Sequence, residues 1–273
     1  MSSVSVIIST YNQPAWLTKA LWGFEGQTVT DFDIVIADDG STEETASVIQ
    51  KFQRKNILKI KHVWQEDDGF QKTKILNKAI QATEAEYLIF TDGDCIPRFD
   101  LIEKHVAMRK KGCFLSGGYY KLPKGLSAKI SEEDIHSKKC FDAAWLVAHG
   151  LKKSFKLNKL TATGTKAAFL NWITPTKATW DGNNASGWRT DIVAVNGFDE
   201  RMQYGGEDRE LGERLMNLGI TPLQGRYSLV TMHLDHEQGY VKEEMMVKNN
   251  RIRKQTKITK STWTPFGLDK KEE

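Results

Sequence analysis

Short apolar runs and amphipathic segments alternate between residues 4 and 91 of the chain. The apolar runs are rich in β-branched residues, which is typical of strands buried in a parallel sheet. They lie at residues 4–8, 33–37, 58–64 and 87–91. The segments between them repeat apolar residues at helical spacing and cover residues 14–25, 41–52 and 73–82. This alternation predicts an α/β fold with a Rossmann-like, mostly parallel central sheet flanked by helices.

Local signals indicate where several elements begin and end. Pro14 suits the first turn of a helix, and Ser41 with Glu44 three residues later indicates a capping box. After residue 118 the periodicity weakens, and only one helix, near residues 141–149, is predicted before residue 179. Further along, the pattern predicts strands at residues 188–195 and 227–233, a helix at residues 207–218 closed by Gly219, and a helical tail from residue 243.

The composition is that of an ordinary soluble protein, with 40 % apolar residues, 27 % charged residues and a formal charge of +4. The apolar runs fall far below the roughly 18 residues that a transmembrane helix needs. The N-terminus lacks the basic and apolar regions of a signal peptide, which predicts a cytoplasmic location. Cys95, Cys113 and Cys140 match neither a disulfide framework nor a zinc pattern, so we expect reduced, structural thiols.

Polar residues follow three of the predicted strands directly. Because ligands of such sheets bind at the carboxyl ends of the strands, these residues are expected to cluster in space. They are Thr10, Tyr11 and Asn12, then Asp38 and Asp39, then Asp92 and Asp94.

The segment Asp92-Gly93-Asp94 offers two carboxylates on a tight turn. Mg²⁺ and Mn²⁺ prefer carboxylate, water and phosphate ligands, so a metal held there could bridge a diphosphate. By itself the motif also fits a polar turn that ends a strand. The residues around Tyr11 and Asp39 could stack on and hydrogen-bond a pyrimidine base, although ordinary turn chemistry explains Asp39-Gly40-Ser41 as well.

Three segments together resemble the opening of family 2 glycosyltransferases in both motif and order. They are VSVIISTYNQ, IADDGSTEET and IFTDGDC, within residues 4–118. The resemblance implies a GT-A fold, a nucleotide-sugar donor and inversion at the anomeric carbon. It further implies that Thr10, Tyr11 and Asp39 contact the base, Asp92 the ribose or metal, and Asp94 the metal.

The segment DDGFQKTKILNKAI resembles the stretch of that family whose basic residues and asparagine face the diphosphate. A solvated helix face is the alternative. The resemblance therefore implies the following nucleotide-sugar-binding set: Thr10, Tyr11, Asn12, Asp38, Asp39, Lys72, Lys74, Asn77, Asp92 and Gly93.

The segment Gly205-Gly206-Glu207-Asp208, with VNGFDERM before it, resembles the C-terminal half of metal-dependent galactosyltransferases and N-acetylgalactosaminyltransferases. The resemblance implies that Asp208 is the catalytic base and that Glu207 positions the acceptor. Trp188, Gly205 and Gly206 would lie beside that acceptor. The alternative is that the two acids are helix N-terminal residues favoured by the helix dipole.

A histidine pair, His233 and His236, follows a predicted strand. Neutral imidazole suits Mn²⁺, and enzymes of this fold often complete the metal site with a histidine from this region. We expect His236 to be the ligand, with His233 as the alternate. Asn184-Ala185-Ser186 matches a glycosylation pattern but is interpreted as a turn.

The resemblance divides the chain into a nucleotide-sugar-binding half (residues 1–118), an acceptor-binding and catalytic-base half (119–240) and a basic C-terminal tail (241–273). The tail could hold the protein at the anionic inner face of the cytoplasmic membrane, although a solvated helix explains it too.

The prediction is an inverting, Mn²⁺- or Mg²⁺-assisted transferase that moves a hexose or N-acetylhexosamine from a UDP-sugar to a glycan or lipid-linked acceptor, in surface polysaccharide or lipopolysaccharide synthesis. Nucleic acid is not an expected partner. A non-catalytic sugar-nucleotide or glycan-binding module is the alternative. A nucleotidyltransferase is a weaker one, because STYNQPAW replaces its glycine-rich loop.

Overall fold

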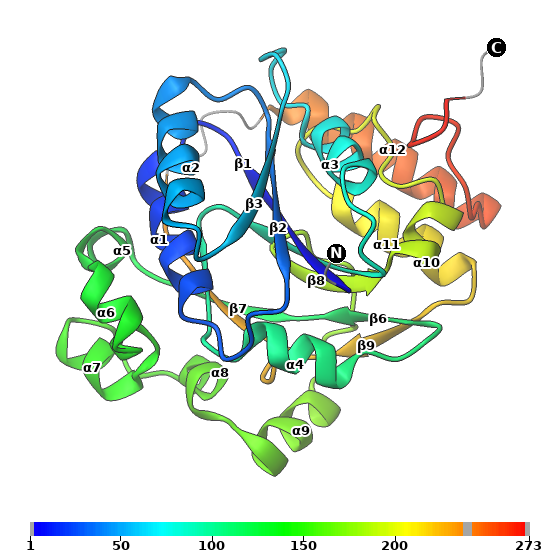
Figure 1. Cartoon of the computed structure of the whole chain (residues 1–273). Helices are drawn as coiled ribbons and strands as arrows, with labels where there is room; N and C mark the ends of the chain where they lie inside the picture. Colours follow the sequence, from blue (N-terminus) through cyan, green and yellow to red (C-terminus); the bar gives the residue numbers. More distant parts are fainter. Residues whose placement is uncertain (1–2, 237–241, 271–273) are drawn as a thin grey trace.

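The computed structural model describes residues 3–236 and 242–270, and a seven-stranded sheet lies at its centre (Figure 1). Its strands follow the order β3-β2-β1-β4-β8-β6-β9. They are β1 Val4–Thr10, β2 Asp33–Asp38, β3 Lys59–Trp64, β4 Tyr87–Asp92, β6 Cys113–Ser116, β8 Asn184–Trp188 and β9 Thr221–Gln224. β1 pairs in parallel with β2 and β4, whereas β8 runs antiparallel between β4 and β6. The predicted mostly parallel sheet is therefore confirmed.

Helices cover both faces of this sheet because successive side chains of β1 point to opposite sides. Val6 and Ile8 pack with α1 and α2, while Ile7 packs with α3 and α11. The helices are α1 Pro14–Glu25, α2 Glu43–Lys55, α3 Lys72–Gln81, α4 Leu101–Met108, α10 Arg189–Ala194, α11 Glu207–Asn217 and α12 Glu243–Thr259. Among the described residues, no helix is long and apolar enough to cross a membrane.

A second, three-stranded sheet has the order β5-β10-β7. It consists of β5 Cys95–Pro97, β7 Gly118–Lys121 and β10 Val230–His233. Short helices cover it: α5 Lys124–Lys129, α6 Glu132–His136, η1 Lys139–Phe141, α7 Ala143–Ala148, η2 Phe155–Leu157, α8 Asn158–Thr161 and α9 Gly164–Ile173. These helices form the part of the chain whose pattern was weak, and in Figure 1 they lie at the left (α5 to α7) and at the bottom (α8 and α9) of the molecule.

The predicted strand at residues 188–195 is wrong. The strand is β8, Asn184–Trp188, and the chain then turns into α10. Ile192 and Val195 are both fully buried and lie three residues apart, which is helical spacing. The strand was placed wrongly because β8 has small and polar residues before Trp188 and no β-branched residue.

The turn predicted at Asn184-Ala185-Ser186 is also wrong, because these residues form most of β8. Their polar groups are satisfied inside the protein by His105, whose ring lies 2.7 Å from Ser186 Oγ and 3.0 Å from Asn184 Oδ1. Burial lowers the pKa of His105 to about 4, so the imidazole is neutral at physiological pH. A buried histidine thus allows a polar segment to occupy the middle of the sheet.

The predicted capping box at Ser41 is absent. The helix begins at Glu43 with Thr42 as its N-cap residue. Ser41 serves a different contact, since its Oγ accepts a hydrogen bond of 2.9 Å from the Asn12 amide. This contact holds the loops after β1 and β2 together at the edge of the sheet.

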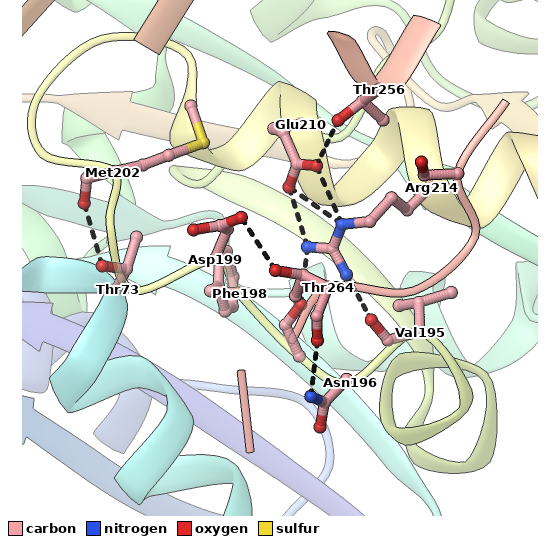
Figure 2. A network of polar contacts seen from close by, with 12 residues as sticks. Thr73, Val195, Asn196, Phe198, Asp199, Met202, Glu210, Arg214, Thr256 and Thr264 are labelled. Atoms are coloured by element: carbon pink, nitrogen blue, oxygen red, sulfur yellow. Dashed lines mark hydrogen bonds and ion pairs between the residues drawn. The ribbon is translucent and has the colours of Figure 1, made fainter. Parts of the chain in front are cut away.

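A buried polar network connects α11 with the C-terminal segment (Figure 2). Arg214 and Glu210 form an ion pair of 2.8 Å in which each side chain is 1 % exposed. Arg214 also donates to the Val195 carbonyl, and Thr256 of α12 donates to Glu210. The same part of the chain is held through Thr264, whose hydroxyl donates to Asp199 and whose carbonyl accepts from Asn196. The predicted tail is therefore packed into the fold.

Candidate active site

A cavity of about 940 Å³ lies at the carboxyl ends of β1 and β4 and the amino end of α11. Ligands of open α/β sheets bind at this edge. Most of the predicted site residues line it, although they come from distant parts of the sequence. They are Thr10, Tyr11, Asn12, Asp39, Lys72, Asp92, Gly93, Asp94, Gly205, Gly206, Glu207, Asp208, His233 and His236.

Four predicted residues do not line this cavity: Asp38, Lys74, Asn77 and Trp188. The fully buried Asp38 accepts a hydrogen bond from the Ser41 amide, and its other oxygen lies 2.9 Å from His62 Nε2. It therefore shapes the loop after β2 from within the core.

Asn77 and Trp188 also have structural partners. The Asn77 side chain donates to the Phe198 carbonyl and accepts from the Phe198 amide, which fastens α3 to the loop before α11. The Trp188 indole donates to the Lys110 carbonyl, and the Lys111 ammonium lies 3.4 Å from its ring centroid. Neither side chain is brought to the predicted diphosphate or acceptor position.

One end of the cavity carries Tyr11 and Asp39. The two Asp39 carboxylate oxygens accept hydrogen bonds from Gln65 Nε2 at 2.6 Å and from the Gln71 amide at 2.9 Å. Burial raises the pKa of Asp39 to about 6, against the opposing effect of these hydrogen bonds. The exposed Tyr11 hydroxyl donates to Asp67, which raises the pKa of that hydroxyl. This end combines an aromatic ring with a fixed acceptor.

Lys72 connects the two halves of the site. Its ammonium lies 2.6 Å from Asp92, which also accepts from Ser9. Burial lowers the pKa of Lys72, but the Asp92 and Glu207 carboxylates outweigh it and hold the pKa above its ordinary value. The ammonium is therefore charged at the point where the two groups of acids approach each other.

Asp94 and the two histidines meet because β5 pairs antiparallel with β10, which places His233 opposite Cys95. Asp94 Oδ2 lies 2.7 Å from His236 Nε2 and 3.5 Å from His233 Nε2. Burial raises the pKa of Asp94. The hydrogen bond to His236 and the electrostatic interaction with His233 together have the larger, opposite effect, so the pKa lies below its ordinary value. One carboxylate with two imidazole nitrogens is a donor set that suits Mn²⁺, so the residues fit the predicted cation.

The turn before α11 positions the two predicted catalytic acids. Gly205 and Gly206 have φ values of +110° and +84°, which favour glycine. The Gly205 amide donates to Glu207 Oε2 at 2.9 Å, and the Gly182 amide donates to Asp208 Oδ2 at 2.9 Å. Burial and repulsion by Asp208 raise the pKa of Glu207 to about 7, although Lys72 opposes this. Asp208 is half-buried and faces the cavity.

Sequence analysis missed several lining residues. Asp181 and Asn183 lie at the amino end of β8, and because β8 is antiparallel, that end lies beside the carboxyl end of β4. Burial and the charges of Asp208 and Asp92 raise the pKa of Asp181 to about 6. A sequence prediction that placed β8 antiparallel to β4 would have brought both residues to the cavity. Met246, Asn250 and Arg253 of α12 also line the cavity, from the segment that was set apart as a tail.

Comparison with known proteins gives consistent results. The family description "Glycosyl transferase family 2" matches residues 5–140. Validoxylamine A glucosyltransferase of Streptomyces hygroscopicus subsp. jinggangensis is 29 % identical over 246 residues, which cover 82 % of this chain and 54 % of that protein. Hyaluronan synthase of Pasteurella multocida is 26 % identical, over 79 % of this chain and 23 % of the synthase. The chain thus spans about half the length, or less, of these relatives.

Two solved structures share the fold. Mannosyltransferase PcManGT from Pyrobaculum calidifontis, in complex with GDP-Man and Mn²⁺, has a TM-score of 0.60 at 19 % identity, over 95 % of this chain and 63 % of its own. S. aureus TarS 1-349, in complex with UDP-GlcNAc, has a TM-score of 0.60 at 17 % identity, over 88 % of this chain and 60 % of its own. These likenesses confirm the predicted GT-A fold.

Proposed function

We propose that this chain, whose residues 5–140 match the description of glycosyl transferase family 2, transfers a hexose or N-acetylhexosamine from a UDP-sugar to a glycan or lipid-linked glycan, with inversion. One observation carries the proposal. A single cavity contains the Tyr11 and Asp39 end, the cluster of Asp94 with two histidines, and the acids of α11. A binding module would need only the first of these.

The donor is proposed to bind with its base between Tyr11 and Asp39. The Asp39 carboxylate can accept the N3–H of uracil, and the Tyr11 ring offers a flat surface beside it. Lys72 would pair with the diphosphate as a compact point charge. The names of the relatives support a hexose or an N-acetylhexosamine, since one is a glucosyltransferase and TarS is in complex with UDP-GlcNAc.

Asp94 and His236 would hold Mn²⁺ or Mg²⁺, with His233 as alternate and Asp92 beside them. When bound, the cation supplies neutralisation of the charge that develops on the leaving diphosphate. This chain's own residues prepare that position, because Asp94 is buried and fixed by two imidazoles.

Asp208 is proposed as the general base. Its carboxylate would take the proton of the acceptor hydroxyl as the hydroxyl oxygen bonds to the anomeric carbon. The bond from that carbon to the diphosphate oxygen breaks on the opposite face, and the nucleoside diphosphate leaves, which inverts the configuration. Glu207, Gly205 and Gly206 would position the acceptor, with Asp181 nearby, next to the Gly182 amide that donates to Asp208. The product would enter a surface polysaccharide or lipopolysaccharide.

The test measures nucleotide release from a panel of UDP- and GDP-sugars with Mn²⁺, with Mg²⁺ or with a chelator. Wild type is compared with Asp94→Ala and Asp208→Asn, and Asp191→Asn on α10, outside the cavity, is the matched control. Metal-dependent release from one UDP-sugar, lost in Asp94→Ala and kept in the control, is the expected result. With an acceptor present, Asp208→Asn is expected to lower transfer by about 10²- to 10⁴-fold while donor binding persists.

Two results would contradict the proposal. Absence of any metal-dependent nucleotide binding would remove the donor site. Tight donor binding with neither hydrolysis nor transfer to any glycan would favour a non-catalytic binding module.

A further inference from the structure

The short helices between residues 143 and 180 expose large apolar side chains that the proposed reaction does not use. Trp172 is 81 % exposed, the highest value among the exposed large apolar residues of the described chain, and Phe155 is 70 % exposed. Phe169 and Ile173 of α9 are 56 % and 46 % exposed, and the Phe169 and Trp172 rings are 6.1 Å apart. Exposed aromatic clusters of this kind mark interaction surfaces.

The same segment is strongly and uniformly basic. Residues 143–180 contain six lysines and neither aspartate nor glutamate. Five of the lysines are exposed: Lys152, Lys153, Lys156, Lys166 and Lys177. The sixth, Lys159, donates to the Tyr119 carbonyl. We use the name α9 surface for Phe155, Phe169, Trp172, Ile173 and these five exposed lysines.

The α9 surface is held on a rigid support. Ala167 and Leu170, on the inner side of α9, pack against Tyr227. The Asn171 side chain donates to Ser228 Oγ at 2.8 Å and accepts from the Tyr227 amide at 2.8 Å. Since the inner side is anchored, α9 presents Phe169, Trp172 and Ile173 on its outer side.

We propose that the α9 surface docks on an anionic lipid membrane. Tryptophan and phenylalanine are favoured at the membrane interface, where the ring is apolar and the surroundings are wet. Lysines beside them add attraction to acidic headgroups, and stable peripheral binding takes two such signals together. Lipid acyl chains can take up all four apolar side chains, whereas an acidic glycan or nucleic acid could stack on the rings but offers no apolar environment for Ile173.

The basic C-terminal helix is a weaker alternative to this surface. On α12, Arg253 and Lys257 are paired with Glu213 of α11, and Met245 is buried. In Figure 1, α9 lies at the bottom of the view and α12 at the upper right, so the two helices are well separated in the molecule. The proposal therefore assigns the contact to α9 and makes α12 the matched control.

The experiment is co-sedimentation with vesicles of phosphatidylcholine, with or without phosphatidylglycerol, in the absence of any sugar donor. Wild type is expected to bind only the vesicles that contain phosphatidylglycerol, and added salt should weaken the binding. Lys152→Gln/Lys153→Gln/Lys156→Gln is expected to lower the partition coefficient about 100-fold. Phe169→Ser/Trp172→Ser should lower it at least about tenfold. The controls Arg251→Gln/Lys254→Gln and Ile258→Ser on α12 should leave it unchanged.

A second measurement reports directly whether the Trp172 ring enters the lipid bilayer. Brominated lipids should quench wild-type fluorescence, and Trp172→Phe should bind equally well with less quenching. Trp64→Phe, which replaces another exposed tryptophan, should keep the wild-type quenching. Equal melting temperatures of all variants would exclude unfolding as the cause.

Three outcomes would overturn the proposal: absence of vesicle binding, loss of binding only in the α12 variants, and retention on a polyanionic resin without binding to vesicles. Because the assay needs neither donor nor turnover, its failure would leave the proposed transferase reaction untouched, and failure of that reaction would leave this result intact.

Discussion

The Glu207 carboxylate is kept in the folded protein at a cost in stability. It is 8 % exposed and repelled by Asp208, and its pKa rises from the ordinary 4.5 to about 7. The folded state therefore holds the proton more tightly than the unfolded chain does. The contribution of this tighter proton binding to the free energy of unfolding is fully present below pH 4.5 and is lost as the pH rises through 7. Sites built for chemistry commonly carry such strain.

Glu207→Gln should therefore stabilise the protein at pH 8 and have little effect near pH 4. The amide can still accept from the Gly205 amide but cannot ionise. Each kcal/mol recovered should raise the melting temperature by about 2–4 °C. Thermal melts across this pH range, with the exposed Glu244→Gln as control, measure the effect. Equal shifts at both pH values would contradict the assigned cause.

At this scale the sequence predicted residues in turns and at element ends better than residues whose side chains pack inward. Asp39, Asp94 and Asp208 reach the cavity because turns at element ends place them there. Asn77 and Trp188 belong to a helix and a strand whose inward faces are determined by packing, which local motifs do not show. Asp181 was missed because its position depends on the direction of β8.

The turn at Gly205 and Gly206 is the element that places the acids of α11. A Cβ on Gly206 would lie 3.0 Å from the Arg253 side chain, whereas nothing lies within 4 Å of a Cβ on Gly219, which closes the same helix. Both glycines have positive φ, +84° at Gly206 and +94° at Gly219. Both ends of α11 thus have a glycine with positive φ, but only Gly206 lies next to Glu207 and Asp208.

Gly206→Ala and Gly219→Ala should each destabilise the protein by about 1–3 kcal/mol. Only Gly206→Ala should also lower kcat/KM, by about tenfold or more, because it displaces Glu207 and Asp208. Urea denaturation and steady-state kinetics separate the two effects. An equal loss of activity in both variants would mean that stability alone, not placement, limits the reaction.

Element prediction succeeded where one period dominated the sequence. The buried parallel strands and α3 follow continuous apolar or helical patterns, and the structure places them within one or two residues of the prediction. β8 failed because polar residues satisfied by His105 carry no strand signal. Among the short helices over the second sheet, the one predicted near residues 141–149 is present as α7, whereas the others were not predicted because each is too brief to establish a period.

At the scale of the whole molecule, the C-terminal segment is joined to α11 and the loop before it by polar contacts. The buried residues of α12 include Asn249 and Thr256, which contact Gln203 and Glu210. An interface made of such groups leaves no apolar stripe in the sequence. The tail was set apart for this reason, although its side chains line the cavity.

Arg214→Leu should destabilise the protein by about 3–5 kcal/mol, because Glu210 would keep a buried charge without its partner. Glu210→Leu/Arg214→Leu should recover part of this loss, and the double-mutant cycle gives the coupling between the two side chains. Denaturant titrations measure each variant. A double variant less stable than Arg214→Leu would show that the other hydrogen bonds of the network, rather than the charge pair, determine its contribution.

The network in Figure 2 also limits how this family of sequences can be recombined. Glu210 and Arg214 lie on α11, while the Thr256 hydroxyl donates to Glu210 and the Thr264 hydroxyl donates to Asp199 from the last part of the chain. Grafting another protein's C-terminal segment onto this chain would leave the Glu210 and Asp199 carboxylates without their hydroxyl partners. A chimera that folds would have to exchange both partners of each of these hydrogen bonds together.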